Sequence, residues 1–185
     1  MGEILLARAL INIDYTNDFV NGALPCGEPA IAIEDEIVRI TEDFIKNGDL
    51  TVMAIDCHEE DDHFHPETKL YPPHNIKGTE GRELYGKLKQ VFEENKGLGH
   101  VKWLDKTRYS AFCGTNLELV LRERNISELH LVGVCTDICV LHTAVDAYNK
   151  GFSIVVYERA TASFNEMGHK WALDHFTGSL NAVVK

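Results

Sequence analysis

The sequence predicts an α/β fold, a doubly wound three-layer arrangement in which a parallel sheet lies between helices on both faces. Two observations predict it. Apolar runs of strand length alternate with segments of helical periodicity along the chain. The strand-length runs are nearly continuous in apolar character, as strands buried on both faces are. No repeat, low-complexity tract or linker breaks the alternation, so residues 1–185 are predicted to form a single domain.

The elements follow one another in a regular order. Strands are predicted at residues 7–13, 50–55, 100–104, 129–134, 152–157 and 180–184. Helices are predicted at residues 33–47, 80–95, 116–124, 137–150 and 166–177, with Gly48 and Gly151 ending two of them. Residues 56–79 carry three prolines and form a long polar loop, and loops of that length in compact domains usually have a function.

Composition limits the partners and the compartment. The formal net charge is −11, which disfavours nucleic acid and anionic membrane surfaces as partners, because both attract basic proteins. No stretch approaches the roughly 18 apolar residues of a membrane span, and the first residues resemble neither a signal peptide nor a myristoylation site. The five cysteines fit reduced thiols better than a disulfide framework. The expected location is therefore the cytoplasm.

Groups able to do chemistry follow four consecutive predicted strands. In strand order these groups are Asp14, then Asp56 with His58, then Lys106, then Cys135 with Cys139. Open α/β sheets bind ligands at the carboxyl ends of their strands. The four positions together therefore predict one site at this edge of the sheet.

Cys139 is the candidate nucleophile. The segment 133–139 leaves a predicted strand and opens a helix, with Thr136 or Asp137 as its N-cap. The free N–H groups of a first helical turn stabilise a thiolate, so the pKa of Cys139 is expected to fall, and the same groups can hold an oxyanion. The alternative is a buried, inert cysteine, a role that suits Cys135 better. The spacing of the two cysteines is not C-x-x-C, which disfavours a zinc or redox pair.

Asp14 and Lys106 are candidates for the acid–base chemistry. A carboxylate at the end of a buried strand is partly desolvated, which raises its pKa and suits it to take a thiol proton and return it to a leaving amine. Lys106 can stabilise the thiolate and the developing charge. The alternatives are a turn-capping aspartate and a solvated surface lysine.

The segment Asp56-Cys57-His58 indicates a metal site. Residues i and i+2 of an extended segment point to the same side, so Asp56 and His58 can converge on one ion. The following loop offers further ligands at His63, His65, Glu67 and His74. Carboxylates and imidazoles suit zinc, manganese or iron. The alternative is an acidic, histidine-rich loop that faces solvent.

In this order the residues resemble the isochorismatase-like cysteine hydrolase superfamily and, within it, the nicotinamidases. The matching segments are I-D-Y-T-N-D-F at 13–19, D-C-H-E-E-D-D-H-F-H-P-E at 56–67, Y-P-P-H at 71–74, K-T-R-Y-S-A-F at 106–112 and G-V-C-T-D-I-C-V at 133–140. The resemblance implies a Rossmann-like fold with a six-stranded parallel sheet. It also implies hydrolysis of nicotinamide to nicotinate and ammonia through a cysteine thioester, a step of NAD salvage.

The resemblance implies a role for each catalytic residue. Asp14, Lys106 and Cys139 would form a catalytic triad. The main-chain amides of Cys135 and Cys139 would form the oxyanion hole, next to a cis peptide bond between Val134 and Cys135.

The resemblance also implies a metal site and an aromatic substrate site. Asp56, His58 and His74 would bind one divalent ion, with Zn²⁺ favoured over Mn²⁺ or Fe²⁺. Family members take the remaining ligand from a histidine, here His63, or from a glutamate, here Glu67, and Glu67 is favoured. The ring of nicotinamide or a related aromatic amide would pack on Phe19, Tyr71 and Tyr109. Relatives are commonly homo-oligomers, so a homo-oligomer is expected.

Three other functions fit the sequence less well. Isochorismatases hydrolyse a vinyl ether and lack the nucleophilic cysteine, so Cys139 disfavours them. Carbamoyl-amide hydrolases keep the triad but lack the metal motif, so Asp56 and His58 disfavour them. A catalytically inactive binding relative would be expected to lose a triad residue, and none is missing.

Overall fold

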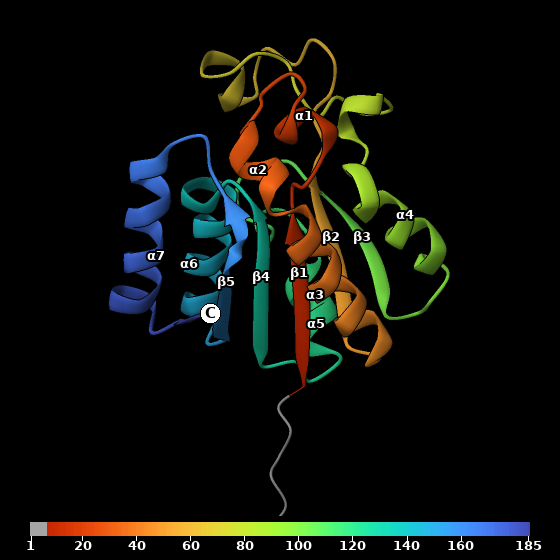
Figure 1. Ribbon diagram of the computed structural model, residues 1–185, viewed down its shortest axis with the longest axis vertical. Coiled ribbons are helices and arrows are strands. Elements are labelled where there is room, and N and C mark those ends of the chain that lie inside the picture. The colour runs from red at the N-terminus through yellow and green to blue at the C-terminus, as the bar shows by residue number, and fades with distance from the viewer. Residues whose placement is uncertain (1–6) are drawn as a thin grey trace, which may run out of the picture.

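A six-stranded parallel sheet organises the molecule, which the computed structural model describes over residues 7–185 (Figure 1). The strands are β1 (Arg8–Ile13), β2 (Leu50–Asp56), β3 (Val101–Lys106), β4 (Glu128–Val134), β5 (Ser153–Ala162) and β6 (Val183–Val184), and their order in the sheet is β3-β2-β1-β4-β5-β6. All five neighbouring pairs are parallel. The predicted fold is confirmed. Residues 1–6, on which the signal-peptide and myristoylation predictions largely rest, lie outside the described residues.

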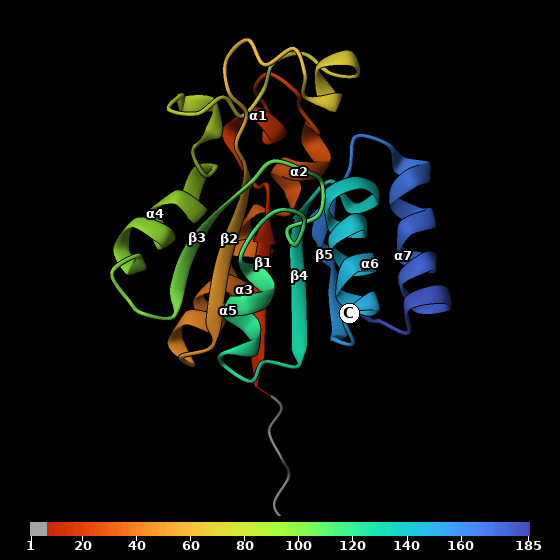
Figure 2. The same ribbon diagram turned by 180° about the vertical axis from the view of Figure 1, so that it is seen from behind.

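Helices cover both faces of this sheet. α3 (Glu34–Lys46) and α4 (Gly86–Asn95) lie on the face toward the viewer in Figure 1. α5 (Leu117–Arg122), α6 (Leu141–Asn149) and α7 (Glu166–Leu180) lie on the opposite face, toward the viewer in Figure 2. The short helices α1 (Asn17–Val20) and α2 (Glu28–Ala32) lie near the carboxyl ends of the strands. Within the described part of the chain, every helix is too short or too polar to cross a membrane.

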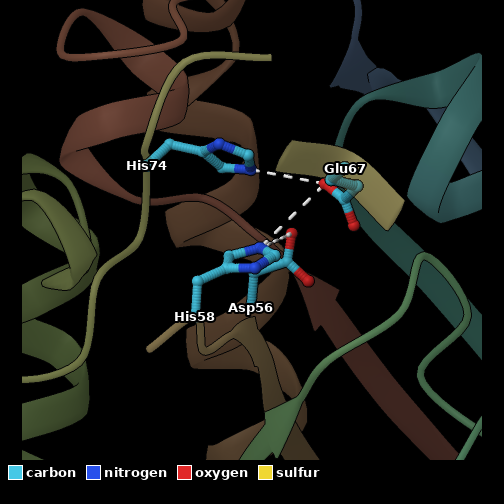
Figure 3. A group of neighbouring side chains, drawn as sticks. All are labelled: Asp56, His58, Glu67 and His74. Atoms are coloured by element: carbon cyan, nitrogen blue, oxygen red, sulfur yellow. Dashed lines mark ion pairs between the residues drawn. The ribbon is translucent and has the colours of Figure 1, made fainter. Parts of the chain in front are cut away.

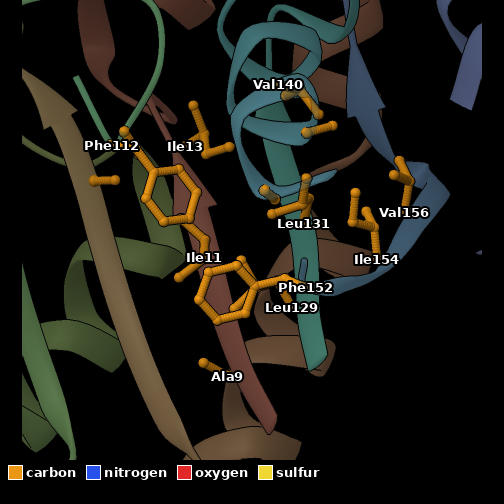
Figure 4. Close-up of a cluster of buried hydrophobic side chains, with 14 of the residues drawn as sticks. Ala9, Ile11, Ile13, Phe112, Leu129, Leu131, Val140, Phe152, Ile154 and Val156 are labelled. Carbon is orange, nitrogen blue, oxygen red and sulfur yellow. The ribbon is translucent and has the colours of Figure 1, made fainter. Parts of the chain in front are cut away.

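Two hydrophobic clusters fill the spaces between the sheet and its helices. Along β1, Ile11 and Ile13 point into the cluster under α5, α6 and α7, whereas Leu10 points into the cluster under α3 and α4. Figure 4 shows the first cluster, in which the ring centroids of Phe112 and Phe152 are 5.8 Å apart. Because both faces of each central strand are buried, consecutive residues must be apolar. This burial explains the continuous apolar runs in the sequence.

Two predicted boundaries in the second half of the chain differ from the structure. β5 continues to Ala162, beyond the predicted end at residue 157. Its pairing with β4 is irregular between Leu131 and Gly133, and the polar residues Glu158 and Arg159 lie in that irregular stretch. These polar residues interrupted the apolar pattern. The predicted strand at 180–184 was wrong in its first part, because Leu180 is the last residue of α7 and packs in the core.

The predicted helix at 80–95 also starts later than expected. It begins only at Gly86, after a 3₁₀ turn, η2 (Glu80–Arg82). Between them, Leu84 forms an isolated bridge with Thr16, and the N–H of Tyr85 donates to the carbonyl of Tyr15 at 3.0 Å. This extended stretch ties the segment after β1 to the edge of the site.

The strand order reverses between β1 and β4. From β1 the chain proceeds through β2 to β3 at one edge, and from β4 it proceeds through β5 to β6 at the other. Sheets of this order bind ligands in the crevice at the carboxyl ends of the two strands that flank the reversal. Gly133 permits their close approach, because its φ is 113° and an added Cβ would lie 1.9 Å from the carbonyl oxygen of Ile13.

Candidate active site

Asp14, Lys106 and Cys139 meet at this reversal point, and all three side chains are buried. The Nζ of Lys106 lies 2.6 Å from Oδ2 of Asp14 and 3.7 Å from Sγ of Cys139. A carboxylate oxygen of Asp14, one of Asp56 and the sulfur of Cys139 lie within 4.8 Å of one another. The structure therefore brings together the three residues that the sequence proposed for catalysis, from the ends of three different strands.

The charges of this group are strongly coupled. Burial raises the pKa of Asp14 to about 6; Asp56 adds to this rise and Lys106 opposes it. Burial alone would lower the pKa of Lys106, but the neighbouring carboxylates of Asp14 and Asp56 raise it well above the ordinary value. Lys106 is therefore a permanent cation, and Asp14 is a carboxylate that accepts a proton more readily than an exposed one.

The predicted low pKa of Cys139 was wrong. Burial raises the pKa of this thiol well above its usual range, and the nearby Lys106 only partly opposes the rise. Cys139 lies in a π-helical turn, η3 (Thr136–Val140), and not in the first turn of an α-helix. The free site therefore holds a neutral thiol, and attack requires a base within reach.

The predicted N-cap was also wrong. Thr136 Oγ1 lies 2.8 Å from Nδ1 of His169, and Asp137 Oδ1 accepts a 2.6 Å hydrogen bond from the hydroxyl of Ser163. Neither side chain caps η3. Both instead tie the nucleophile segment to α7 and the chain before it.

The peptide bond between Val134 and Cys135 is cis, as the resemblance implies. It directly precedes η3, so the amides of Cys135 and Cys139 belong to one short segment. The side chain of Cys135 is buried and its sulfur lies 3.3 Å from that of Cys26. This packing fits the structural role predicted for the Cys135 side chain.

Asp56, His58, Glu67 and His74 form a second cluster, whose side chains converge in Figure 3. One potential ligand atom from each lies within 4.8 Å of the others, and all four residues are buried. Nε2 of His74 is 3.4 Å from Oε2 of Glu67, and Nε2 of His58 is 3.8 Å from Oδ2 of Asp56. Glu67, and not the exposed His63, joins this cluster.

The donor atoms of this cluster fit a divalent ion. Within residues 7–185, Oδ2 of Asp56 and Nε2 of His58 and of His74 have no hydrogen-bond partner. Because buried polar atoms are nearly always paired, such convergence points to a bound cation. Two imidazoles and two carboxylates are a ligand set that zinc, manganese and iron accept.

Main-chain hydrogen bonds hold the two halves of the metal-type cluster together. The N–H of His58 donates to the carbonyl of Asn75 at 3.1 Å, and the N–H of Lys77 donates to the carbonyl of His58 at 2.9 Å. Glu67 lies in the 3₁₀ turn η1 (Pro66–Lys69), where its N–H donates to Nδ1 of His65. Nε2 of His65 lies 2.7 Å from the carbonyl of Thr107. His65, one of the loop ligands considered from sequence, therefore positions Glu67.

A small, mostly apolar cavity lies between the two clusters. Phe19, Tyr71 and Tyr109 line it together with Glu67 and Cys139. Its volume is about 10 Å³, so the lining side chains must move apart to admit an aromatic ring. The three aromatic residues predicted to contact a substrate ring thus surround the space between nucleophile and metal-type cluster.

Three further residues line this cavity, and sequence reasoning did not single them out. They are Leu24, Ile138 and Phe164. Ile138 directly precedes the nucleophile, and Phe164 follows the carboxyl end of β5. The strand-end rule points to Phe164 only once the observed end of β5 at Ala162 is known, because the predicted strand ended at residue 157.

Comparison with known proteins supports this arrangement. The chain matches the family model of the isochorismatase domain over residues 8–185. It is 62% identical over 181 residues to a protein named uncharacterized isochorismatase family protein PncA from Bacillus subtilis (strain 168), covering 97% of this chain and 99% of that protein.

Solved structures of similar proteins have the same fold. The crystal structure of a nicotinamidase/pyrazinamidase PncA from Bacillus subtilis superimposes with a TM-score of 0.95 at 64% identity, covering 97% of this chain and 99% of that one. The structure of a pyrazinamidase from Pyrococcus horikoshii in complex with zinc gives a TM-score of 0.84 at 26% identity, covering 97% and 98%.

Proposed function

This chain belongs to the isochorismatase family, and we propose that within the family it is a nicotinamidase, which hydrolyses nicotinamide to nicotinate and ammonia. One observation carries the proposal. The Asp14–Lys106–Cys139 group and a metal-type cluster face each other across one cavity lined by aromatic side chains. The 64% identity to a protein crystallised as a nicotinamidase/pyrazinamidase supports the choice of substrate.

The reaction begins with a proton transfer. Asp14 takes the proton of the neutral Cys139 thiol, since its raised pKa brings it closer to that of the thiol. The Lys106 ammonium, 3.7 Å from the sulfur, stabilises the thiolate. The thiolate then attacks the amide carbon and forms a C–S bond.

The second half of the reaction returns the proton. The amides of Cys135 and Cys139 hold the oxyanion. When the C–N bond breaks, Asp14 gives its proton to the leaving nitrogen, which departs as ammonia. Water then attacks the thioester while Asp14 accepts a proton from it; the C–S bond breaks, and Cys139 regains a proton as nicotinate leaves.

Asp56, His58, Glu67 and His74 would hold one divalent ion, and we propose zinc, because a pyrazinamidase 26% identical to this chain was crystallised in complex with zinc. A bound ion would supply a Lewis-acid centre for a ring nitrogen and for water. The side chains of Phe19, Tyr71 and Tyr109 confine the ring, so that its carboxamide faces Cys139.

Ammonia release from nicotinamide tests the proposal. The purified protein should turn over nicotinamide, lose activity on chelation and regain it with added zinc. Cys139→Ala should lower turnover by at least about 10³-fold, since removal of a nucleophile has effects of that size or larger. Cys113→Ala, at an exposed free cysteine, is the matched control. No turnover of nicotinamide by metal-loaded wild type, with turnover of another amide, would remove the nicotinamidase assignment and keep the cysteine hydrolase.

Three other expectations from the sequence stay predictions. We propose that residues 1–185 act as one hydrolase domain, that the protein is cytoplasmic and that it forms a homo-oligomer. The oligomer rests only on the family resemblance. Sedimentation velocity of the purified chain decides it, because a monomer at micromolar concentration contradicts it.

A further inference from the structure

A second and larger cavity adjoins the metal-type cluster from the solvent side. Its volume is about 140 Å³, compared with about 10 Å³ for the catalytic cavity. Three of the four cluster residues, His58, Glu67 and His74, form part of its wall. The rest of the wall comes from the surrounding loop, including the exposed residues Glu59, Asp61, Asp62 and His63.

The inner wall of this cavity offers unpaired ligand atoms. His58 and His74 are 9% and 3% exposed. Among the residues that the structure describes, neither Nε2 atom makes a well-aligned hydrogen bond, although that of His74 lies 3.4 Å from Oε2 of Glu67. The cavity therefore leads from solvent to buried nitrogen atoms that are free to bind an ion.

The outer wall of the cavity is acidic. Glu59, Asp61 and Asp62 contribute three carboxylates, and the nearest ion pair, between Glu59 and Lys77 at 3.2 Å, neutralises one of them. Clefts lined by charge of one sign raise the local concentration of counter-ions and speed their association. The charge of this wall thus favours divalent cations.

The catalytic cavity is a poorer path for an ion. Its wall is mainly aromatic and aliphatic. Of the four cluster residues only Asp56 and Glu67 line it, whereas both histidines line the larger cavity. The larger cavity has roughly ten times the space that one water needs, so an ion can keep several waters until the histidines replace them.

We propose that the larger cavity is the route by which the divalent ion enters and leaves the cluster of Asp56, His58, Glu67 and His74. The inference rests on the proposed metal site and not on the identity of the amide substrate. It assigns Asp61 and Asp62 the role of attracting the ion, and it makes ion exchange independent of the catalytic cavity.

The rate of Zn²⁺ uptake tests the route without any activity measurement. The full-length chain is freed of metal and mixed with Zn²⁺ in a stopped-flow instrument, with a chromogenic indicator that reports free zinc. Asp61→Asn/Asp62→Asn should slow uptake about threefold or more at low ionic strength, and the difference should shrink at about 1 M salt, where screening acts over only about 3 Å. The amount bound should stay at one ion per chain.

The two substitutions preserve the loop. Asp61 has a φ of 61°, a conformation that asparagine also tolerates. Asp62 Oδ1 accepts a hydrogen bond from the N–H of Phe64, which an asparagine oxygen can also do. Glu93→Gln/Glu94→Gln on α4 is the matched control, since it changes the net charge by the same amount at exposed positions away from the cavity.

Four outcomes would overturn the route or the metal site on which it rests. Equal uptake rates for the two double variants would show that only net charge matters. Faster uptake in Phe164→Ala, which opens the catalytic cavity, would show that the ion passes through that cavity. Wild type that binds no zinc would remove the metal site itself. Zinc binding by wild type, with uptake at the same rate by Asp61→Asn/Asp62→Asn, would remove only the route.

Discussion

Lys106 is the residue on which both clusters depend. Its ammonium is fully buried and contacts Asp14 at 2.6 Å and Asp56 at 2.5 Å. Asp56 in turn directs its other oxygen toward His58. One lysine thus neutralises the proposed general base and fixes a proposed metal ligand, so its loss leaves two buried carboxylates without a cation.

The first prediction concerns Lys106→Met. Breaking a buried ion pair by removing one partner costs about 3–5 kcal/mol, so the free energy of unfolding should fall by about that much in urea titrations. Turnover should fall at least about 10²-fold, because the thiolate loses its cation. Lys170→Met removes an exposed pair with Glu166 and should cost less than about 1 kcal/mol. A Lys106→Met protein as stable as wild type would contradict this account of the charges.

The second prediction concerns Phe164, which lines the catalytic cavity while 46% exposed. Its neighbours hold the chain rigidly: Ser163 donates to Asp137, and the Asn165 side chain caps α7. We expect Phe164→Ala to raise KM for nicotinamide about 5-fold or more, since one lost apolar contact in a pocket is worth about 1–3 kcal/mol. Relative turnover of ring-substituted nicotinamides should rise.

Met167 provides the control for this residue. It lies three positions further along the chain, is 81% exposed and does not line the catalytic cavity. Met167→Ala should leave both kinetic constants unchanged. If the two variants have the same KM, Phe164 has no part in confining the substrate.

At the scale of elements, the junction between β4 and η3 positions the nucleophile. Gly133 pairs with Ile13 across the two central strands, just before the cis peptide bond and the η3 turn. Only a residue without a Cβ allows the end of β4 to approach β1 this closely. The distance between Asp14 and Cys139 therefore depends on the backbone as well as on side-chain packing.

The third prediction is that Gly133→Ala destroys this junction. An alanine at this position would have to adopt a φ of 113°, and its Cβ would lie only 1.9 Å from the carbonyl oxygen of Ile13. We expect loss of more than about 3 kcal/mol of stability, because strained backbone and overpacking add, together with loss of turnover. Gly178→Ala lies within α7 with open space around its Cβ, and it should stabilise the protein by about 0.5–1 kcal/mol. Thermal unfolding of both variants checks the contrast.

The sequence predicted elements where one local pattern decides them. The strands β1, β2 and β4 are buried on both faces, so each is a nearly continuous apolar run that can be recognised in the sequence. The π-helical turn that carries Cys139 and the irregular pairing of β5 could not be predicted, because both depend on hydrogen bonds to neighbouring elements. The short helices α1 and α2 lack the several turns that helical periodicity requires.

At the scale of the whole molecule, the strand-end rule located the site because the reversal of strand order brings β1 and β4 together. The rule could not choose between Glu67 and His63, since both lie on one loop and only the folded loop places Glu67 in the cluster. It also could not give the pKa of Cys139, because burial by residues distant in sequence outweighs the local helix geometry. Packing between residues distant in sequence thus determines both the fourth residue of the cluster and the pKa of Cys139.

The stability of the whole molecule should depend on pH through His130. This residue is 2% exposed in β4, with its two ring nitrogens 2.9 Å from the hydroxyl of Tyr157 and 2.8 Å from a carboxylate oxygen of Glu128. Burial lowers its pKa below 6.5; Arg8 and Lys185 lower it further, and Glu128 opposes them. His130 is therefore neutral in the folded protein at a pH where the unfolded chain binds a proton.

The fourth prediction follows from that difference. The contribution of a neutral buried His130 is complete above about pH 6.5 and is lost as the pH falls from there toward the folded pKa, because the unfolded state binds the extra proton. Between about pH 7.5 and about pH 5.5 the free energy of unfolding of wild type should fall more than that of His130→Gln, by at most about 1.4 kcal/mol. Asp14, whose pKa is raised, acts in the opposite sense but equally in both proteins, so it cancels in the comparison. Urea titrations at the two pH values measure the difference, and equal losses in the two proteins would show that His130 titrates alike in the folded and unfolded states.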